Sequence, residues 1–527
     1  MKNITLNFLF IISFTFNSNA QVSQEWLYEI NSPGIIYGQG NAVVCDQNNN
    51  IYVGGTVSKS STTWPTFIKM NSDGTAIFID TLSLGNGGFS LTSLFYDNQS
   101  TVYATGQLSD SISTMFIAAY DTSGFRIWLH TYLTDDNEEI LGVQISKSPN
   151  GNLYALGNTY DSLFKSHLYL IQSDLSGNPT WNSNDSGLNV ISTFPKKFVI
   201  DQNEQIYCLA NAQLNGSNNI DIILICYDQN GSVLWYHSIN GPLDDDDFDH
   251  DINIDNSGNI LISGYIQDTV PTNNCLIEKY DPMGNLLWSK IYNMLGSGKI
   301  LIDQENNIYI DGTDSVFTNL FGISKLDSSG NLLYTRNFNL LNYWEILISD
   351  MKMDDSSNIY LTGNGFSLNS VYDFITYKLD TSLNEIWHVQ YLDTNTLGES
   401  PTSLALDHNG SVYVTGMSNY DQVSTTSNLC LVKYNQGFTT DINNNPDDNV
   451  IIIYPNPAIN SFTIKLNFEF KNASINIYDI VGQKIFSKNL HNQNEITLNA
   501  QNILSKGIYL VKIIDGKKEY NSKLIIE

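Results

Sequence analysis

The stretch DHNGSVYVTG, residues 407–416, decides the fold of this chain because it is the best-kept of eight versions of one phrase. In each version a hydrophobic run ends at an anchor residue, a polar turn follows, and a strand begins that has the form Tyr-x-x-Gly in six of the eight; Ala210 replaces the Gly in one and Leu261 the Tyr in another. The other seven strands of this type start at Ile51, Val102, Leu153, Ile206, Ile260, Ile308 and Ile359. Aromatic and β-branched residues bounded by turn residues predict strands. A long fixed period predicts stacked supersecondary units.

Each repeat reads as four strands. The inner strands end at anchors 48 to 54 residues apart: Asp46, Asp97, Lys147, Asp201, Asp255, Asp303, Asp354 and Asp407. After the third strand, an Asp-x-x-Gly turn leads to a fourth strand that often carries Trp, and we assign the repeated Asp, Gly and Trp to structure. Four antiparallel strands in a unit of this length form one blade of a β-propeller. The sequence therefore predicts an all-β propeller of about eight blades over residues 21–438. We expect the ring to close by pairing Glu25–Glu29 with the C-terminal strands.

The two ends of the chain differ from the repeats. Residues 1–20 combine Lys2, a short apolar run and small residues before position 21, which predicts a secretory signal peptide. No later stretch is apolar for the ~20 residues that a membrane span needs. After a polar linker at 439–450, residues 451–527 change the balance of charge from acidic to basic. Their alternating runs predict a small immunoglobulin-like β-sandwich.

Four motifs in this last segment resemble the C-terminal sorting domain of the type IX secretion system. The matching residues are Tyr454, Pro455, Asn456 and Pro457, then Gly482 after a short strand, then Lys506, Gly507 and Tyr509, and Lys523 near the end. The resemblance implies the type IX machinery as a partner, export through the periplasm and across the outer membrane, and release or attachment at the cell surface. An ordinary immunoglobulin-like binding module is the alternative.

The repeats resemble the bacterial β-propeller family known as SBBP. The shared phrase is Asp-x-x-Gly-Asn-x-Tyr-Val-x-Gly, best kept at residues 407–416, and the resemblance covers residues 40–435. Members of that family are mostly uncharacterised exported proteins. The resemblance therefore implies fold and compartment rather than an activity.

Composition excludes some partners. The formal net charge is −29, and a nucleic-acid phosphate backbone requires a basic patch, so nucleic acid is not expected. An acidic surface suits an exported protein, which we expect to be a monomer. Five Cys is an odd number. Cys208 and Cys226 lie on neighbouring predicted strands and either pair or remain buried thiols.

The loops between second and third strands, and those between blades, vary in length. In a propeller they emerge on one face, which we call the variable face, and function tends to lie on such loops. This face is acidic, with runs at residues 135–139 and at Asp244, Asp245, Asp246 and Asp247. Clustered carboxylates could hold calcium. The alternative is a solvated acidic loop.

The inner strands allow a sharper prediction because side chains alternate along a strand. Counting back from each anchor, positions one and three are mainly apolar and pack between blades, so positions two and four face the central channel. Position four reads Ala42, Ser93, Val143, Lys197, Asp251, Lys299, Asp350 and Ser403. Lys352 adds a charge at position two. These charges either form neutralising ion pairs or bind a polar ligand or ion at the axis.

No catalytic motif is present: the sequence lacks GxSxG, HExxH, a P-loop and a dinucleotide fingerprint. Our leading hypothesis is a secreted or surface-displayed binding or adhesion propeller for a glycan or protein. The alternatives are an exported hydrolase, lyase or quinoprotein-type enzyme with its site at the channel mouth, and a structural surface scaffold. The fold does not choose among them.

Overall fold

The computed structural model describes most of the propeller and of the C-terminal segment. The described residues are 22–30, 34–60, 62–83, 88–109, 112–134, 138–185, 187–243, 245–269, 272–293, 298–312, 321–338, 340, 343–367, 372–391, 398–421, 426–436, 451–454, 458, 460–470, 473–479, 483–490, 493–499, 504–515 and 518–526. The chain divides into two compact units, Met1–Gln436 and Gly437–Glu527. The predicted signal peptide and the predicted linker lie outside the described residues.

Within the described residues, the first unit consists of eight four-stranded sheets. Blade 1 is β2 (Ile35–Cys45), β3 (Ile51–Lys59), β4 (Thr62–Met70) and β5 (Ala76–Thr81). Blade 2 is β6 (Gly88–Tyr96), β7 (Thr101–Ser109), β8 (Ser113–Asp121) and β9 (Arg126–Tyr132). Blade 3 is β10 (Ile140–Lys147), β11 (Leu153–Tyr160), β12 (Ser166–Ser173) and β13 (Pro179–Asn184). Blade 4 is β14 (Val190–Ile200), β15 (Ile206–Leu214), β16 (Ile220–Tyr227) and β17 (Val233–Ile239).

The remaining blades follow the same order, from an inner strand to an outer one. Blade 5 is β18 (Phe248–Ile254), β19 (Ile260–Thr269), β20 (Thr272–Tyr280) and β21 (Leu286–Tyr292). Blade 6 is β22 (Ile300–Ile302), β23 (Ile308–Asp311), β24 (Phe321–Leu326) and β25 (Leu332–Phe338). Blade 7 is β26 (Tyr343–Met353), β27 (Ile359–Ser367), β28 (Tyr372–Leu379) and β29 (Glu385–Tyr391). Blade 8 is β30 (Ser400–Leu406), β31 (Val412–Asp421), β32 (Thr426–Asn435) and, as its outer strand, β1 (Ser23–Ile30).

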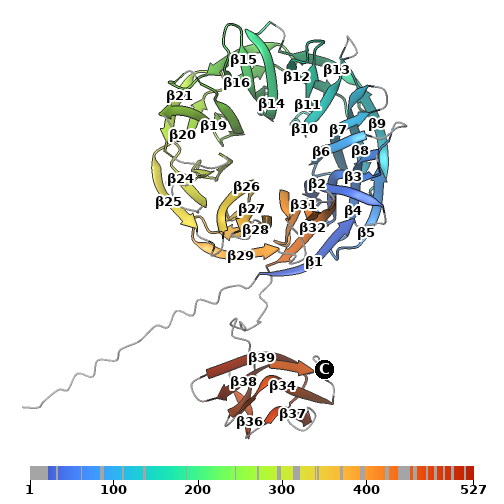
Figure 1. Ribbon diagram of the computed structural model, residues 1–527, viewed down its shortest axis with the longest axis vertical. Coiled ribbons are helices and arrows are strands. Elements are labelled where there is room, and N and C mark those ends of the chain that lie inside the picture. The colour runs from blue at the N-terminus through green and yellow to red at the C-terminus, as the bar shows by residue number, and fades with distance from the viewer. Residues whose placement is uncertain are drawn as a thin grey trace, which may run out of the picture. The chain divides into compact units, whose positions relative to one another are not determined.

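The two ends of the propeller close the ring together. Strand β1 pairs antiparallel with β32, from Ser23 opposite Asn435 to Ile30 opposite Leu429. Figure 1 shows the blades as a closed ring, with the blue β1 beside the orange β32. Closure leaves no blade without a neighbour, which limits the exposed edges that a linear array would have. The prediction of eight blades and of closure by the N-terminal strand is confirmed.

The repeated Tyr donates a hydrogen bond to the repeated Asp in blades 1, 4, 6, 7 and 8. In blade 1 the Asp46 Oδ1 atom accepts the backbone N–H groups of Asn48 (2.8 Å) and Asn50 (2.9 Å), and its Oδ2 accepts the hydroxyl of Tyr52 (2.8 Å). The same pair recurs as Tyr207 with Asp201, Tyr309 with Asp303, Tyr360 with Asp354, and Tyr413 with Asp407. These bonds satisfy a buried carboxylate, whose desolvation would otherwise be costly. The repeated pair is therefore structural.

One predicted anchor was wrong. In blade 3 the turn is held by Ser148, whose Oγ accepts the N–H of Asn152 at 3.2 Å, and not by the preceding Lys147. A serine offers only one oxygen, so Tyr154 donates instead to Glu204 of blade 4 at 3.1 Å. Counting from Ser148 moves position four of this blade from Val143 to Gln144.

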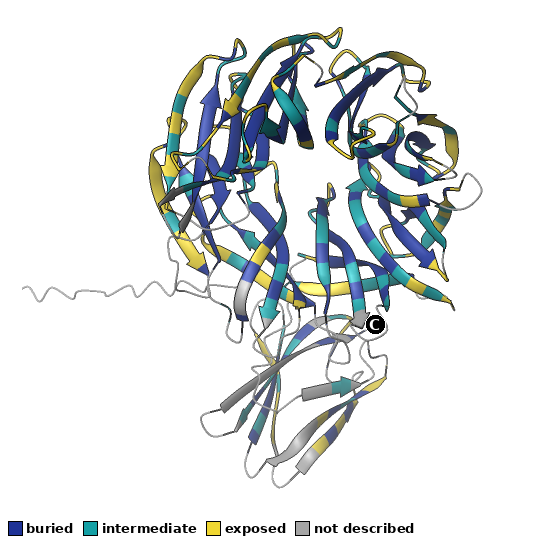
Figure 2. Cartoon of the chain, turned by 45° about the horizontal axis from the view of Figure 1, so that its top comes forward, coloured by how far each residue is buried: buried dark blue, intermediate teal, exposed yellow. Residues whose placement is uncertain are grey.

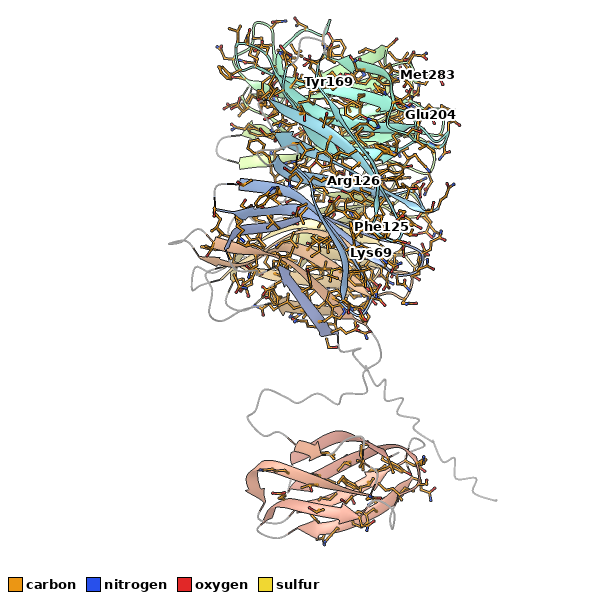
Figure 3. The ribbon with its side chains drawn as sticks, turned by 90° about the vertical axis from the view of Figure 1, so that its right-hand side faces the viewer. Lys69, Phe125, Arg126, Tyr169, Glu204 and Met283 are labelled. Atoms are coloured by element: carbon orange, nitrogen blue, oxygen red, sulfur yellow. The ribbon has the colours of Figure 1, made fainter. Side chains whose placement is uncertain are left out.

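A belt of aromatic contacts joins the outer strands; we call it the outer belt. The indole N–H of Trp181 donates to the carbonyl oxygen of Gln229 in the next blade (2.9 Å), and a Cβ on Gly231 would lie 2.6 Å from the Trp181 ring. The equivalent indole bonds join Trp26 to Ser72, Trp128 to Leu175, and Trp235 to Pro282. In blade 1 Phe78 replaces Trp and packs on Phe125, with ring centroids 5.0 Å apart. Figure 3 labels this contact region at Lys69, Phe125 and Arg126.

The outer belt is interrupted at the closure seam. No Asp-x-x-Gly turn stands before β1, the outer strand of blade 8, since residues 1–22 contain neither Asp nor Gly. Trp387 is 5% exposed, and its indole N–H has no hydrogen-bond partner among the described residues. Gln436 occupies the seam instead, accepting from Lys378 Nζ at 2.6 Å and from the hydroxyl of Tyr360 at 3.2 Å.

The apolar core lies between blades rather than within them. Phe67 of blade 1 stacks on Tyr120 of blade 2 with ring centroids 3.7 Å apart, and neighbouring blades share such clusters around the ring. Figure 2 shows the buried residues concentrated on the middle strands of the blades and the exposed ones on the outer strands, while the innermost strands are largely intermediate. The glycine of Tyr-x-x-Gly permits close approach both within and between blades: a Cβ on Gly416 would lie 2.1 Å from the Ser400 carbonyl oxygen of the same blade and 2.9 Å from the Phe374 ring of blade 7.

All five cysteines are free thiols. Cys208 pairs in register with Ile225, and Cys226 pairs with Tyr207, so the two side chains project from opposite faces of the sheet. Cys208 packs towards blade 3 and Cys226 towards blade 5. The geometry of these strands excludes a disulfide between them.

The second unit is a sandwich of two sheets. One sheet contains β33 (Ile451–Tyr454), β34 (Ser461–Phe470) and β37 (Gln493–Asn499). The other contains β36 (Lys484–Leu490), β35 (Ala473–Tyr478), β38 (Gly507–Asp515) and β39 (Lys518–Ile526). Phe462, Ile475 and Val511 belong to one buried core shared by both sheets. An immunoglobulin-like topology stays a prediction. The part of the chain that the structure describes has no helix with the length and hydropathy that crossing a bilayer requires.

Candidate functional site

The inner strands share an irregularity that the sequence did not reveal. In seven of the eight blades the pairing of the inner strand with its neighbour shifts by one residue just before position four. The extra residues at these β-bulges are Asn41, Thr92, Val143, Lys196, His250, Ser349 and Thr402. Strand β22 of blade 6 begins beyond this point. A bulge kinks the strand and re-aims the side chains that precede it.

Bulge residues bond the next blade where their chemistry permits. The Asn41 amide donates to the carbonyl of Leu91 at 2.8 Å, and the Thr92 hydroxyl donates to the carbonyl of Gly142 at 2.8 Å. Together with position four, these residues form a ring of inter-blade contacts around the axis, which we call the inner belt.

Side chains at position four also accept backbone hydrogen bonds from the next blade. The Gln144 Oε1 atom accepts the backbone N–H of Phe198 at 2.8 Å. The Oδ2 atom of Asp251 accepts from Ile300, and that of Asp350 accepts from Leu404, both at 3.0 Å. In every case the acceptor belongs to one blade and the donor to the position-three residue of the following blade.

Asp251 is the most heavily engaged group in the inner belt. It is 5% exposed, and its Oδ1 accepts from Lys197 Nζ at 2.6 Å and from the N–H of Ile252 at 2.9 Å. Burial alone would raise the pKa of Asp251, but the charges of Lys197 and Lys299 and the bond from Ile300 hold it below the ordinary value. Asp251 is therefore ionised at neutral pH.

Asp350 is engaged in the same way but on a more open side of the ring. Its Oδ1 accepts from Lys352 Nζ at 3.0 Å and from the N–H of Met351 at 2.9 Å. Desolvation lowers the pKa of Lys352, yet the nearby carboxylates of Asp350 and Asp251 raise it above the ordinary value. Blade 7 thus acts electrostatically on blade 5, and the structure brings Lys197, Asp251, Lys299, Asp350 and Lys352 into one charged cluster.

The ring has two chemically different halves. On blades 4 to 7, the bulge and position four carry charged residues, namely Lys196, Lys197, Asp251, Lys299 and Asp350. On blades 8, 1, 2 and 3, position four and the bulge hold Ser403, Thr402, Ala42, Asn41, Ser93, Thr92, Gln144 and Val143, none of which is charged. We call these the charged half and the neutral half of the channel.

Three large apolar side chains stand beside the charges, towards the variable face. Phe194, Phe248 and Leu347 are 42%, 41% and 50% exposed. Their register partners lie two residues from the partners of position four on the second strand, so they share its side of the sheet. An exposed side chain on an innermost strand reaches solvent along the axis of the ring. The extra residue of the bulge reverses the alternation of side chains along the strand. Without it, Asp249 rather than Phe248 would share the channel side with Asp251.

Asp249 and His250 are the perturbed groups of the charged half. Asp249 is 4% exposed and has one carboxylate oxygen without a partner among the described residues; burial raises its pKa to about 7, against the lowering effect of Lys196. Burial, helped by Lys196 and Lys299, lowers the pKa of His250 to about 4, so its ring is neutral at physiological pH. The ring packs edge-on against Tyr265 at 4.3 Å.

In the described part of the predicted calcium loop, two of the carboxylates accept hydrogen bonds from backbone N–H groups. Asp246 accepts the N–H of Ile220 at 2.9 Å, and the buried Asp247 accepts the N–H of Gln267 at 3.1 Å and that of Gly241. Asp245 is exposed, and Asp244 lies outside the described residues. Among the residues that the structure describes, no group of three His, Cys, Asp or Glu side chains is placed to hold a metal ion.

Two shallow depressions lie on the outer rim beside Trp235. One of them is lined by Asn203, Gln205, Pro282 and Met283, among others. The indole N–H of Trp235 is already bonded to Pro282 at 3.3 Å. The indole N–H of Trp235 is therefore engaged in the outer belt and is not available to a ligand in these depressions.

The predicted sorting residues are only partly described. Lys506 is exposed and Gly507 begins β38, where Tyr509 is buried with its hydroxyl donating to the Ser505 carbonyl at 2.8 Å. Tyr454 and Lys523 lie on β33 and β39. Pro455, Asn456, Pro457 and Gly482 lie outside the described residues.

Residues 452–527 match a family model described as a secretion system C-terminal sorting domain. The resemblance to type IX sorting domains is thereby confirmed for this segment, which indicates export via the periplasm to the cell surface or the medium. No curated protein matches the chain.

Solved structures similar to the chain have low identity. A protein of unknown function from Dyadobacter fermentans is 9% identical, with 78% of this chain and 98% of that one covered and a TM-score of 0.39. The WD40 domain of SCAP from fission yeast is 8% identical over 78% and 97%, with a TM-score of 0.41. Sqt1 from Chaetomium thermophilum is 10% identical over 76% and 98%, with a TM-score of 0.41. At such scores they say nothing about the function of this chain.

Proposed function

We propose that this chain is an extracellular binding or adhesion module of the SBBP type, and that its glycan or protein ligand occupies the charged half of the channel. An N-terminal signal peptide would deliver it to the periplasm, and the type IX machinery would carry the monomeric propeller outward. The observation that supports the binding site is the asymmetry of the inner belt: one half is neutral and the other holds the cluster around Lys197, Asp251 and Lys299.

Ring closure alone does not require these charges. The neutral half joins its blades with the short polar side chains of Asn41, Thr92, Gln144 and Thr402. Buried ion pairs stabilise weakly, because desolvation offsets the Coulomb attraction. A structural scaffold would be served equally well by the same neutral chemistry all around the ring, so the charged half favours binding.

The same geometry favours a binding protein over an enzyme. A general acid or base must reach the proton that it transfers. Both oxygens of Asp251 and both oxygens of Asp350 accept bonds from backbone N–H groups, with Lys197, Lys352 or Ser403 adding a further partner. Asp249, the carboxyl group with the raised pKa, is buried between blades.

A glycan and protein array with the purified chain tests this proposal. We expect at least one ligand whose binding falls by about tenfold or more in the double variant Lys299→Gln/Phe248→Ala, since a charged hydrogen bond and an apolar contact are lost together. The matched control is Lys165→Gln/Phe125→Ala, which changes an exposed lysine and an exposed phenylalanine outside the axis. Binding that survives the first variant, or is lost equally in both, would refute a channel site.

A further inference from the structure

We infer that the ligand of the charged half is an acidic saccharide, a chain of sugars carrying carboxylate or sulfate groups. This inference rests on the proposed function and specifies its ligand. It combines three features of the axis: an excess of positive charge, exposed apolar side chains, and facing polar side chains.

The first feature is the local charge. The charged half contains Lys196, Lys197, Lys299 and Lys352 against the carboxyl groups of Asp251, Asp350 and Asp311, the last of which accepts the backbone N–H of Lys299 at 2.6 Å. Lys197 pairs with Asp251 and Lys352 pairs with Asp350, but neither Lys196 nor Lys299 forms an ion pair with any described residue. Two ammonium groups are therefore left for a ligand.

The protein around this cluster has the opposite sign. The chain has a formal net charge of −29, so an anion is repelled by most of its surface. A concave, low-dielectric site lined by one sign of charge concentrates field lines and raises the local concentration of counter-ions. The excess of lysine at the axis thus selects a negatively charged ligand and directs it to the channel.

The buried neighbours do not cancel this charge. Burial keeps Asp249 protonated up to about pH 7. His250 is neutral over the same range. The positive excess at the axis therefore persists at neutral pH and below.

The second feature is the group of exposed apolar side chains Phe194, Phe248 and Leu347. Their partners on the second strand lie two residues from the partners of position four, so they are the next side chains on the same side of the sheet. The residues equivalent in register on the neutral half are Gln39, Ser90, Leu141 and Ser400, none of which is aromatic, although Phe89 and Ile36 are also exposed on the inner strands of that half. Flat apolar surfaces beside a few polar groups are typical of ligand sites. The C–H face of a sugar ring suits such a surface.

The third feature is the neutral half itself, where Gln39, Ser90 and Ser400 hold the register positions of Phe194, Phe248 and Leu347. The Ser90 hydroxyl is already bonded to Asn41 and Thr56, which leaves Gln39 and Ser400 for a ligand. Amides and hydroxyls both donate and accept hydrogen bonds, which matches sugar hydroxyls. An acidic peptide would use the lysines but would leave this polar half with little to bind. The combination therefore favours a saccharide.

Binding of the purified full chain to polygalacturonate, dextran sulfate, neutral dextran and poly-glutamate tests the inference. We expect binding to polygalacturonate or dextran sulfate, and the difference between the two identifies the acidic group. Raising NaCl from about 50 mM to about 500 mM should weaken binding by about tenfold or more, because the charges are screened. Lys299→Gln should weaken it by about tenfold, whereas Lys299→Arg, which keeps the charge, should retain it within about threefold.

Two controls separate binding from folding. The melting temperature of Lys299→Gln should stay within a few degrees of the wild type, because Lys299 makes no ion pair among the described residues and acts on Asp251 only through its charge. Lys165→Gln, on an exposed loop, should bind as the wild type does.

The outcomes distinguish this inference from the proposed function. Equal binding of poly-glutamate would overturn the saccharide class, and binding of neutral dextran with no effect of Lys299→Gln would overturn the acidic one; in both cases a channel ligand found on the array would still stand. If none of the four polymers binds while the array ligand still requires Lys299 and Phe248, the inference alone fails. If no ligand on the array depends on these residues, the proposed function fails and the inference fails with it.

Discussion

The outer belt and the inner belt join the same eight blades in opposite ways. At the rim, one contact is repeated: an aromatic ring lies on a glycine turn, as Trp181 lies on Gly231. At the axis, one backbone device is repeated, the β-bulge, but the side chains that it presents change from blade to blade. Repetition at the rim preserves the fold, whereas variation on a repeated geometry at the axis provides the site that we propose. Four predictions test this contrast.

The largest effect is expected from opening the ring. Deleting residues 22–30 removes β1, and with it the antiparallel pairing with β32. Blades 8 and 1 then lose their shared packing around Trp26 and Ile30, and we expect loss of cooperative thermal unfolding near the wild-type temperature. Removal of residues 437–527, a separate compact unit, is the control and should leave the melting of the propeller unchanged. A propeller that melts normally without β1 would show that closure is not needed.

A smaller effect should follow from breaking one contact of the outer belt. Gly231 has a φ of 80°, and a Cβ there would lie 2.6 Å from the Trp181 ring. Gly231→Val adds overpacking to backbone strain and should cost roughly 4 kcal/mol in urea unfolding. Gly258→Val is matched in φ, at 83°, but a Cβ there meets nothing within 4 Å. If the two variants lose equal stability, the ring contact contributes nothing.

The charged half of the channel should respond to pH through Asp249, which stands just before the bulge of blade 5. The pKa of Asp249 is raised from 3.8 to about 7, so its protonated form favours folding. The stability that it contributes is full below about pH 4 and is lost as pH rises through 7. Asp249→Asn should therefore stabilise the protein at pH 8 by roughly 3 kcal/mol and leave it almost unchanged at pH 4. Asp245→Asn, on an exposed residue, is the control, and an equal gain at both pH values for Asp249→Asn would contradict the account.

The smallest effect compares two tryptophans. Replacing Trp181 by Phe removes an indole hydrogen bond of 2.9 Å, whereas Trp387 has no such bond among the described residues. Trp387 is the more buried of the two rings, and its replacement also removes an indole N–H that has no partner among the described residues, so the comparison sets a satisfied donor against an unsatisfied one. Trp181→Phe should cost about 1 kcal/mol more than Trp387→Phe in urea unfolding. No difference would mean that the rim depends on packing alone.

Much of the fold could be predicted because residues that contact each other recur at fixed spacing in the repeats. Asp46 and Tyr52 recur at fixed spacing because they bond each other, and the Trp26 strand at the start of the chain supplies the outer strand that the last repeat lacks. The charged cluster was also predictable, because position four faces the same way in every blade. Lys147 was mistaken for an anchor because Ser148, a weaker turn acceptor, stands next to it.

The rest of the site was hidden by the bulge. Strict alternation from Asp251 assigns Asp249 to the channel, but the extra residue, His250, reverses the phase and places Phe248 there. In other blades Gly40, Gly142, Pro195 and Pro401 stand just before the bulge. Glycine and proline at a fixed point of a strand are typical of bulges, and this signal would have corrected the phase.

A crystal structure of the chain with its tightest saccharide ligand tests the central claim most directly. The account predicts ligand density on the axis against blades 4 to 7, with an acidic group near Lys299 Nζ and a sugar ring against Phe248. Density on the outer rim, on the uniform turns or on the C-terminal unit would contradict it.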